Sequence, residues 1–153
     1  MEAMKAQAAY FRVALQLGVC TVSDVIRWSD AEIARLEEPP LALVELALLE
    51  NGNPLDVMSK LYELSAGAPA LSVLRRVLGQ AHEELVRHPE LGPILARGLY
   101  QIYVESGYRV PEDLTPMAAF EDRFALAREG TYETEEEVLR DLLEFTGEFA
   151  QER

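Results

Sequence analysis

The chain has 153 residues, of which 49% are hydrophobic and 27% charged, a composition typical of a folded globular domain and not of a disordered chain. Its formal net charge of −13 at pH 7 argues against non-specific binding to nucleic acid or to an anionic membrane. The single cysteine, Cys20, excludes an intramolecular disulfide, and with only two histidines the sequence predicts neither a metal site nor a cofactor.

The acidic residues are unevenly placed along the chain. Residues 1–76 contain 10 acidic and 7 basic residues, whereas residues 77–153 contain 17 and 7. The C-terminal half therefore carries most of the negative charge and suits a basic partner. No apolar run has transmembrane length, and the first residues lack the apolar segment of a signal peptide. We expect a cytoplasmic protein that binds neither membrane nor nucleic acid directly.

Apolar residues recur at helical spacing in several segments of the first half of the chain, and Gly, Asn and Pro lie between these segments. The pattern predicts four helices, over residues 4–18, 22–36, 40–50 and 54–67. Thr21 and Asp24 have the spacing of a capping box, which favours a helix start at this point. Pro40 suits the first turn of the third helix because its missing N–H would be unbonded there in any case.

The second half of the chain predicts four more helices by the same signals. They are expected over residues 69–88, 91–106, 115–130 and 134–152, with a loop over 107–114. Thr115 and Pro116 are suited to start the seventh helix, and Thr134 with Glu137 repeats the capping-box spacing at the start of the last one. Gly92, Pro93 and Gly98 lower the helix propensity of the sixth.

These elements predict an all-α protein with about seven to eight helices in a single domain over residues 1–153. Sustained alternation of apolar and polar residues, the signal of a strand, does not occur. The short Gly-, Pro- and Asn-containing connections favour antiparallel neighbours. An irregular bundle and a stack of helical hairpins both satisfy the pattern.

The sequence contains no catalytic motif. A Gly-x-Ser-x-Gly elbow and a glycine-rich phosphate loop are both missing. Glu84 and His88 are the one local pair of a histidine and a carboxylate at helical spacing, and a pair is too few for a site. We therefore predict a protein that is not an enzyme, since catalysis would require carboxylates brought together from separate helices.

Trp28 is the only tryptophan and lies at the edge of the apolar stripe of the second helix. Polar residues surround it in the sequence, which is the setting of a half-exposed aromatic side chain that anchors a partner. Packing against a neighbouring helix explains the same position. We predict Trp28 as a partner-binding residue and keep packing as the alternative.

The last helix carries the clearest pattern in the chain. Its apolar face is expected to consist of Val138, Leu142, Phe145 and Phe149. Five carboxylates fall on another arc of the same helix, with only Arg140 nearby in the sequence. They form the predicted acidic ridge: Glu137, Asp141, Glu144, Glu148 and Glu152. A solvated outer face is the ordinary reading of such a ridge, and electrostatic recognition of a basic protein is the functional one.

Residues 24–33 and 38–47, read as DVIRWSDAEI and EPPLALVELA, resemble a segment of small bacterial helical proteins of uncharacterised function. Some of those proteins resemble immunity partners of polymorphic toxins. The resemblance covers about the first 65 residues and implies a helical fold and a toxin-neutralising role. The acidic last helix lies outside it.

Together these features predict a non-enzymatic, cytoplasmic protein-binding module. Its partner would be a basic protein, such as a toxin or nuclease, that an immunity-type inhibitor covers with an acidic C-terminal helix. A homodimeric helical scaffold or regulatory protein, associating through Trp28, is the alternative.

Overall fold

The computed structural model describes residues 2–150, which form eight α-helices and no strand. The helices are α1 (Glu2–Gln16), α2 (Val22–Arg35), α3 (Leu41–Ala47), α4 (Pro54–Leu64), α5 (Leu71–Arg87), α6 (Gly92–Glu105), α7 (Phe120–Arg128) and α8 (Glu135–Ala150). Two short 3-10 helices, η1 (Pro89–Leu91) and η2 (Glu112–Ala118), lie before α6 and α7. The predicted all-α, single-domain fold is confirmed.

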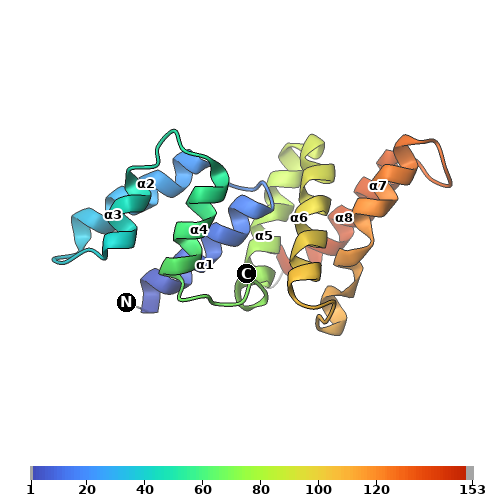
Figure 1. Cartoon of the computed structure of the whole chain (residues 1–153). Coiled ribbons are helices and arrows are strands. Elements are labelled where there is room, and N and C mark those ends of the chain that lie inside the picture. The colour runs from blue at the N-terminus through green and yellow to red at the C-terminus, as the bar shows by residue number, and fades with distance from the viewer. Residues whose placement is uncertain (1, 151–153) are drawn as a thin grey trace.

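The helices stand side by side, from α2 and α3 at one end of the molecule to α7 and α8 at the other (Figure 1). The most extensive packing joins α5 with α8 and α1 with α4, which are not consecutive in the chain. An irregular bundle therefore describes the packing better than a stack of consecutive hairpins. No helix within residues 2–150 is both long and apolar enough to cross a membrane.

Two hydrophobic cores fill the domain, and α1 belongs to both of them. The N-terminal core lies among α1–α4, and the C-terminal core lies among α1 and α5–α8. Met4 and Ala8 of α1 are buried in the first core, whereas Val13 and Leu17, one to three turns later, are buried in the second. Because one helix supplies side chains to both cores, it fixes the two ends of the molecule relative to each other.

Local hydrogen bonds start the helices where the sequence predicts. Thr21 accepts a bond from the Asp24 N–H, and the Asp24 carboxylate accepts one from the Thr21 N–H, which completes the predicted capping box of α2. The Asn53 side chain accepts a bond from the Leu55 N–H at the start of α4. At the end of α1, Gly18 adopts a φ of 76°, a left-handed conformation that glycine adopts without steric cost.

Several predicted boundaries are wrong. The fourth helix ends at Leu64 and not near Gly67, and the end of the predicted loop over residues 107–114 lies in η2. The third helix ends at Ala47 and not at Glu50, because the chain turns after Leu48 and the Leu49 carbonyl accepts a bond from the Gly52 N–H. The segment with Thr115 and Pro116, expected to start an α-helix, lies inside η2. The 3-10 turn continues to Ala118, and α7 begins only at Phe120.

Candidate functional site

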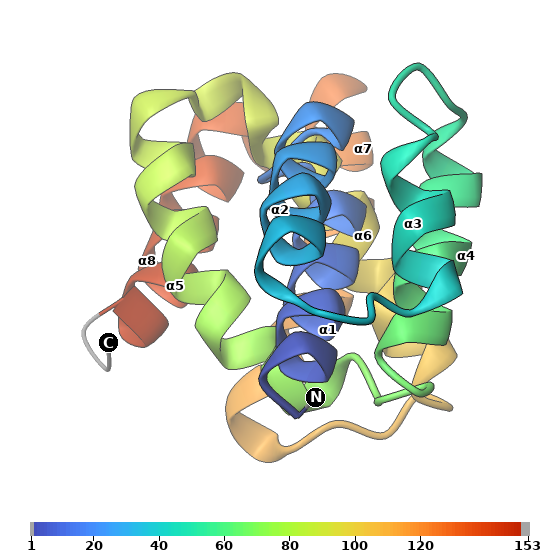
Figure 2. The same cartoon turned by 90° about the vertical axis from the view of Figure 1, so that its left-hand side faces the viewer.

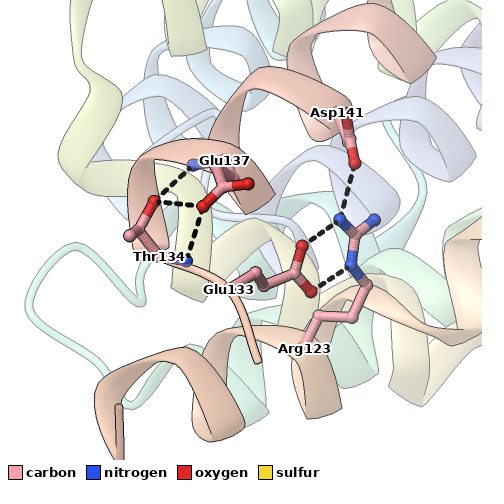
Figure 3. Close-up of polar contacts among 5 residues, drawn as sticks. All are labelled: Arg123, Glu133, Thr134, Glu137 and Asp141. Atoms are coloured by element: carbon pink, nitrogen blue, oxygen red, sulfur yellow. Dashed lines mark hydrogen bonds and ion pairs between the residues drawn. The ribbon is translucent and has the colours of Figure 1, made fainter. Parts of the chain in front are cut away.

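The acidic helix α8 begins with the predicted capping box and buries the predicted apolar face. Thr134 accepts a bond from the Glu137 N–H, and the Glu137 carboxylate accepts bonds from both the N–H and the hydroxyl of Thr134 (Figure 3). The apolar face is fully inside the C-terminal core, with 5% exposure or less at each position: Val138, Leu142, Phe145 and Phe149. The helix is thus held by one face and leaves another for solvent or a partner.

Arg123 of α7 neutralises part of the acidic ridge, which corrects the prediction that only Arg140 lies near it. The Arg123 guanidinium donates to both carboxylate oxygens of Glu133, at 2.9 and 2.7 Å, and to Asp141 at 2.6 Å (Figure 3). Its carbon also lies 5.5 Å from the centre of the Phe120 ring. Asp141 therefore ties α8 to α7, and its first role is structural.

The same contacts shift the protonation of Arg123 and Glu133. Hydrogen bonding to Glu133, and then to Asp141, raises the pKa of the Arg123 guanidinium above its usual range. The hydrogen bonds from Arg123 lower the pKa of the Glu133 carboxyl below its usual range. Both groups are therefore charged at neutral pH, and the ion pair that joins α7 to the segment before α8 persists into mildly acidic solution.

The five residues of the predicted acidic ridge have different roles in the structure. Glu137 caps α8, Asp141 binds Arg123, and Glu152 lies outside the described residues. Glu144 and Glu148 are exposed, and neither has a hydrogen bond or ion pair with any residue in the described part of the chain. We call these two the free carboxylates of α8, since they are the ridge members left for a partner.

Trp28 packs as a core residue of the N-terminal half. Its ring centre lies 5.3 Å from that of Phe11 on α1, and the residue is half-buried against the N-terminal core. Its indole N–H is buried and has no hydrogen-bond partner among the described residues. Packing therefore accounts for part of the ring, and the partner-binding role of Trp28 stays a prediction.

The side chains that could bind a metal ion or act as a nucleophile do not gather into a site among the described residues. Within residues 2–150, no three side chains of His, Cys, Asp and Glu are placed to hold a metal ion. The Cys20 thiol donates a long bond, of 3.9 Å, to the Phe11 carbonyl, and burial raises its pKa to about 12. It therefore remains protonated at neutral pH and is a poor nucleophile.

Sequence reasoning missed Arg123 and Glu133, the two residues that organise this end of the molecule. Glu133 lies 10 residues after Arg123 and Asp141 lies 18 after it, so no helical spacing relates them. The usable signal was compositional: Arg123 is one of three basic residues among ten acidic ones between Phe120 and Ala150. A cation in so acidic a segment has a carboxylate within reach once α7 and α8 pack together.

Comparison of the chain with protein-family models, with curated proteins and with solved structures finds no match. The resemblance of residues 24–33 and 38–47 to small bacterial helical proteins, and the toxin-neutralising role that it implies, therefore remain predictions. What the chain binds has to be argued from its surface.

Proposed function

We propose that the protein is a non-enzymatic binding module that binds a basic protein through the free carboxylates of α8. The observation that carries the proposal is the exposure of Glu144 and Glu148 without a partner among the described residues, whereas the other described members of the acidic ridge, Glu137 and Asp141, cap α8 and pair with Arg123. An immunity-type inhibitor of a basic toxin or nuclease is the specific role we favour.

The electrostatics of this end of the molecule support a basic partner. Ten acidic and three basic residues lie between Phe120 and Ala150, and one of the three, Arg123, is used internally. Such an excess of one charge accelerates encounter with an oppositely charged protein and orients it during approach. Glu144 and Glu148 also repel each other as an i,i+4 pair, at a cost of roughly 0.2–0.5 kcal/mol that a cation would relieve.

A charge-matched pair of variants tests the proposal. Glu144→Lys/Glu148→Lys reverses the free carboxylates, whereas Glu38→Lys/Glu50→Lys makes the same change in net charge at exposed positions outside α8. A basic protein captured by the wild-type chain should bind the α8 variant at least about tenfold more weakly and the control variant almost unchanged. Equal weakening of both variants would show that net charge alone governs capture and would remove α8 as the site.

One observation supports the second candidate, a homodimeric scaffold, at a surface other than Trp28. The exposed face of α3 carries apolar residues at positions i, i+3 and i+7, with Leu41 74%, Val44 36% and Leu48 79% exposed. A two-fold interface pairs such a stripe with its own copy. Sedimentation should then show a dimer that Leu48→Lys dissociates and Trp28→Phe does not, whereas a monomer at all concentrations would exclude this candidate.

A further inference from the structure

A groove separates α4 from α6. It consists of two adjoining hollows of about 560 and 580 Å³, which share Arg12, Tyr62 and Glu105 in their linings. In the second hollow, residues of α4 and α6 form the two walls and α1 supplies Arg12 and Gln16 between them. The first hollow is lined mainly by residues 67–71, which follow α4. Figure 2 shows α4 and α8 on opposite sides of α1, so the groove is a surface separate from the free carboxylates of α8.

The walls of the groove are apolar and partly exposed. Leu55 and Tyr62 line it from α4, and Tyr100 and Val104 line it from α6. These four side chains are between 37% and 68% exposed, although they are of the types that proteins usually bury. Tyrosine is enriched among the residues that contribute most to binding at protein interfaces, because it combines a large apolar ring with a polar hydroxyl.

Arg12 is the one cation in the lining of the groove, beside the single carboxylate of Glu105, and its setting is unusual for this chain. Among the described Lys and Arg residues four are half-buried rather than exposed, and three of these, Lys5, Lys60 and Arg123, have a carboxylate within 4.0 Å. Arg12 has none, although the chain contains 27 acidic residues. A half-buried cation without a counter-charge is costly, because it has lost part of its hydration and gained no ion pair.

The contacts that Arg12 does make leave part of its guanidinium unbonded. One terminal nitrogen, Nη2, donates to the Ala68 carbonyl at 2.6 Å, and the guanidinium carbon lies 5.1 Å from the centre of the Tyr62 ring. The Nε atom is buried without a hydrogen-bond partner among the described residues. Burial lowers the pKa of the Arg12 guanidinium below its usual range, and the negative charge of Glu105 partly opposes that shift.

We infer that this groove binds an apolar peptide segment of a partner protein and that an Asp or Glu side chain of the segment pairs with Arg12. The peptide's apolar side chains lie on Leu55, Tyr62, Tyr100 and Val104, and its carboxylate supplies the direct ion pair that Glu105, which acts on Arg12 only from a distance, does not make. Glu105 is the one acidic residue of the lining, and it is held by a 3.1 Å bond from the Gln16 amide. It opposes the incoming carboxylate and so tunes the affinity.

Matched peptides test the inference directly. The probe is a fluorescent, N-acetylated and C-amidated peptide of leucine and alanine with one central glutamate, and its control carries glutamine at that position. We expect the glutamate peptide to bind about tenfold more tightly, measured by fluorescence anisotropy, and to shift the NMR signal of the Arg12 Nε–H group. Equal affinities for the two peptides, or binding of neither, would overturn the inference and leave Arg12 with only the role of holding the Ala68 carbonyl.

Two substitutions separate recognition from folding. Glu105→Gln removes the opposing charge at an exposed position, so it should tighten the glutamate peptide about threefold and leave the glutamine peptide unchanged. Arg12→Gln should abolish the preference for the glutamate peptide over the glutamine peptide. If Arg12→Gln fails to fold, the affinities of Glu105→Gln test the inference on their own. Unchanged affinity in Glu105→Gln would contradict a carboxylate placed beside Arg12.

The same assay tests whether the groove binds a side-chain carboxylate or the C-terminus of a chain. It also tests whether the groove acts independently of the free carboxylates of α8. A glutamine peptide with a free C-terminus that binds in place of the amidated glutamate peptide would show capture of a chain end, contrary to the inference. The Glu144→Lys/Glu148→Lys variant should bind the glutamate peptide as the wild type does. Failure of the α8 proposal would therefore leave this result intact, and the reverse also holds.

Discussion

Gly98, in the interior of α6, lies directly against the C-terminal end of α1. A Cβ at this position would lie 2.6 Å from the Gln16 carbonyl oxygen and 2.8 and 3.1 Å from Leu17 atoms, including its Cα. Two of the three obstructing atoms belong to the backbone of α1 or the residue that follows it, so no change of rotamer relieves the clash. Gly98→Ala should therefore force α1 and α6 apart.

The size of the effect follows from two opposing terms. Replacing a helical glycine by alanine gains about 1 kcal/mol of helix propensity. Overpacking a tight contact costs typically about 1–3 kcal/mol, and a backbone contact at 2.6 Å places Gly98 at or above the upper end of that range. We expect a net loss of about 2 kcal/mol, which lowers the melting temperature of a domain of this size by roughly 4–8 °C.

Gly147→Ala in α8 is the matched control for this prediction. Its new Cβ would meet the edge of the His82 ring, at 3.2 Å, and a half-exposed ring can shift. Urea unfolding followed by circular dichroism should place this variant within about 1 kcal/mol of the wild type. A Gly98→Ala protein as stable as the wild type would refute the close packing of α1 against α6, and with it the geometry of the neighbouring groove.

Three further expectations concern the acidic end of the domain. Thr134→Ala removes the capping box of α8 and should cost about 1 kcal/mol of unfolding free energy in urea titrations, and no loss would mean that the cap is not formed in solution. Arg123→Gln should lose more stability at pH 7 than the exposed Arg128→Gln. The lowered pKa of Glu133 means that its stabilisation is present above the ordinary glutamate pKa of about 4.3 and is lost as the pH falls through the folded value, so the two variants should converge in acid. Raising the salt concentration from about 0.02 to about 0.5 M should stabilise the wild-type protein by screening its repulsions, and a fall in melting temperature would contradict that reasoning.

Features that depend on residues close in the sequence were predictable. Both capping boxes were found from a spacing of three residues, because the two hydrogen bonds of the motif are local: Thr21 with Asp24, and Thr134 with Glu137. The buried face of α8 was found for the same reason, since one helix turn fixes which side chains share a face.

Features that depend on how separate helices meet were not predictable. Arg123 reaches Asp141 only because α7 lies against α8. Gly98 read in sequence as a residue that weakens a helix, whereas the structure uses its missing side chain to bring α6 against α1. The groove of Arg12 joins residues from α1, α4 and α6, and nothing in the sequence around any of them indicates that they converge.

The central claim is that the free carboxylates of α8 form a binding face for a basic protein. The most direct measurement is the dissociation constant of the captured basic protein for three forms of this chain at about physiological salt: wild type, Glu144→Lys/Glu148→Lys and Glu38→Lys/Glu50→Lys. The account predicts a loss of at least about tenfold in the α8 variant alone, with all three forms equally folded by circular dichroism. Equal affinity of the wild type and the α8 variant would contradict it.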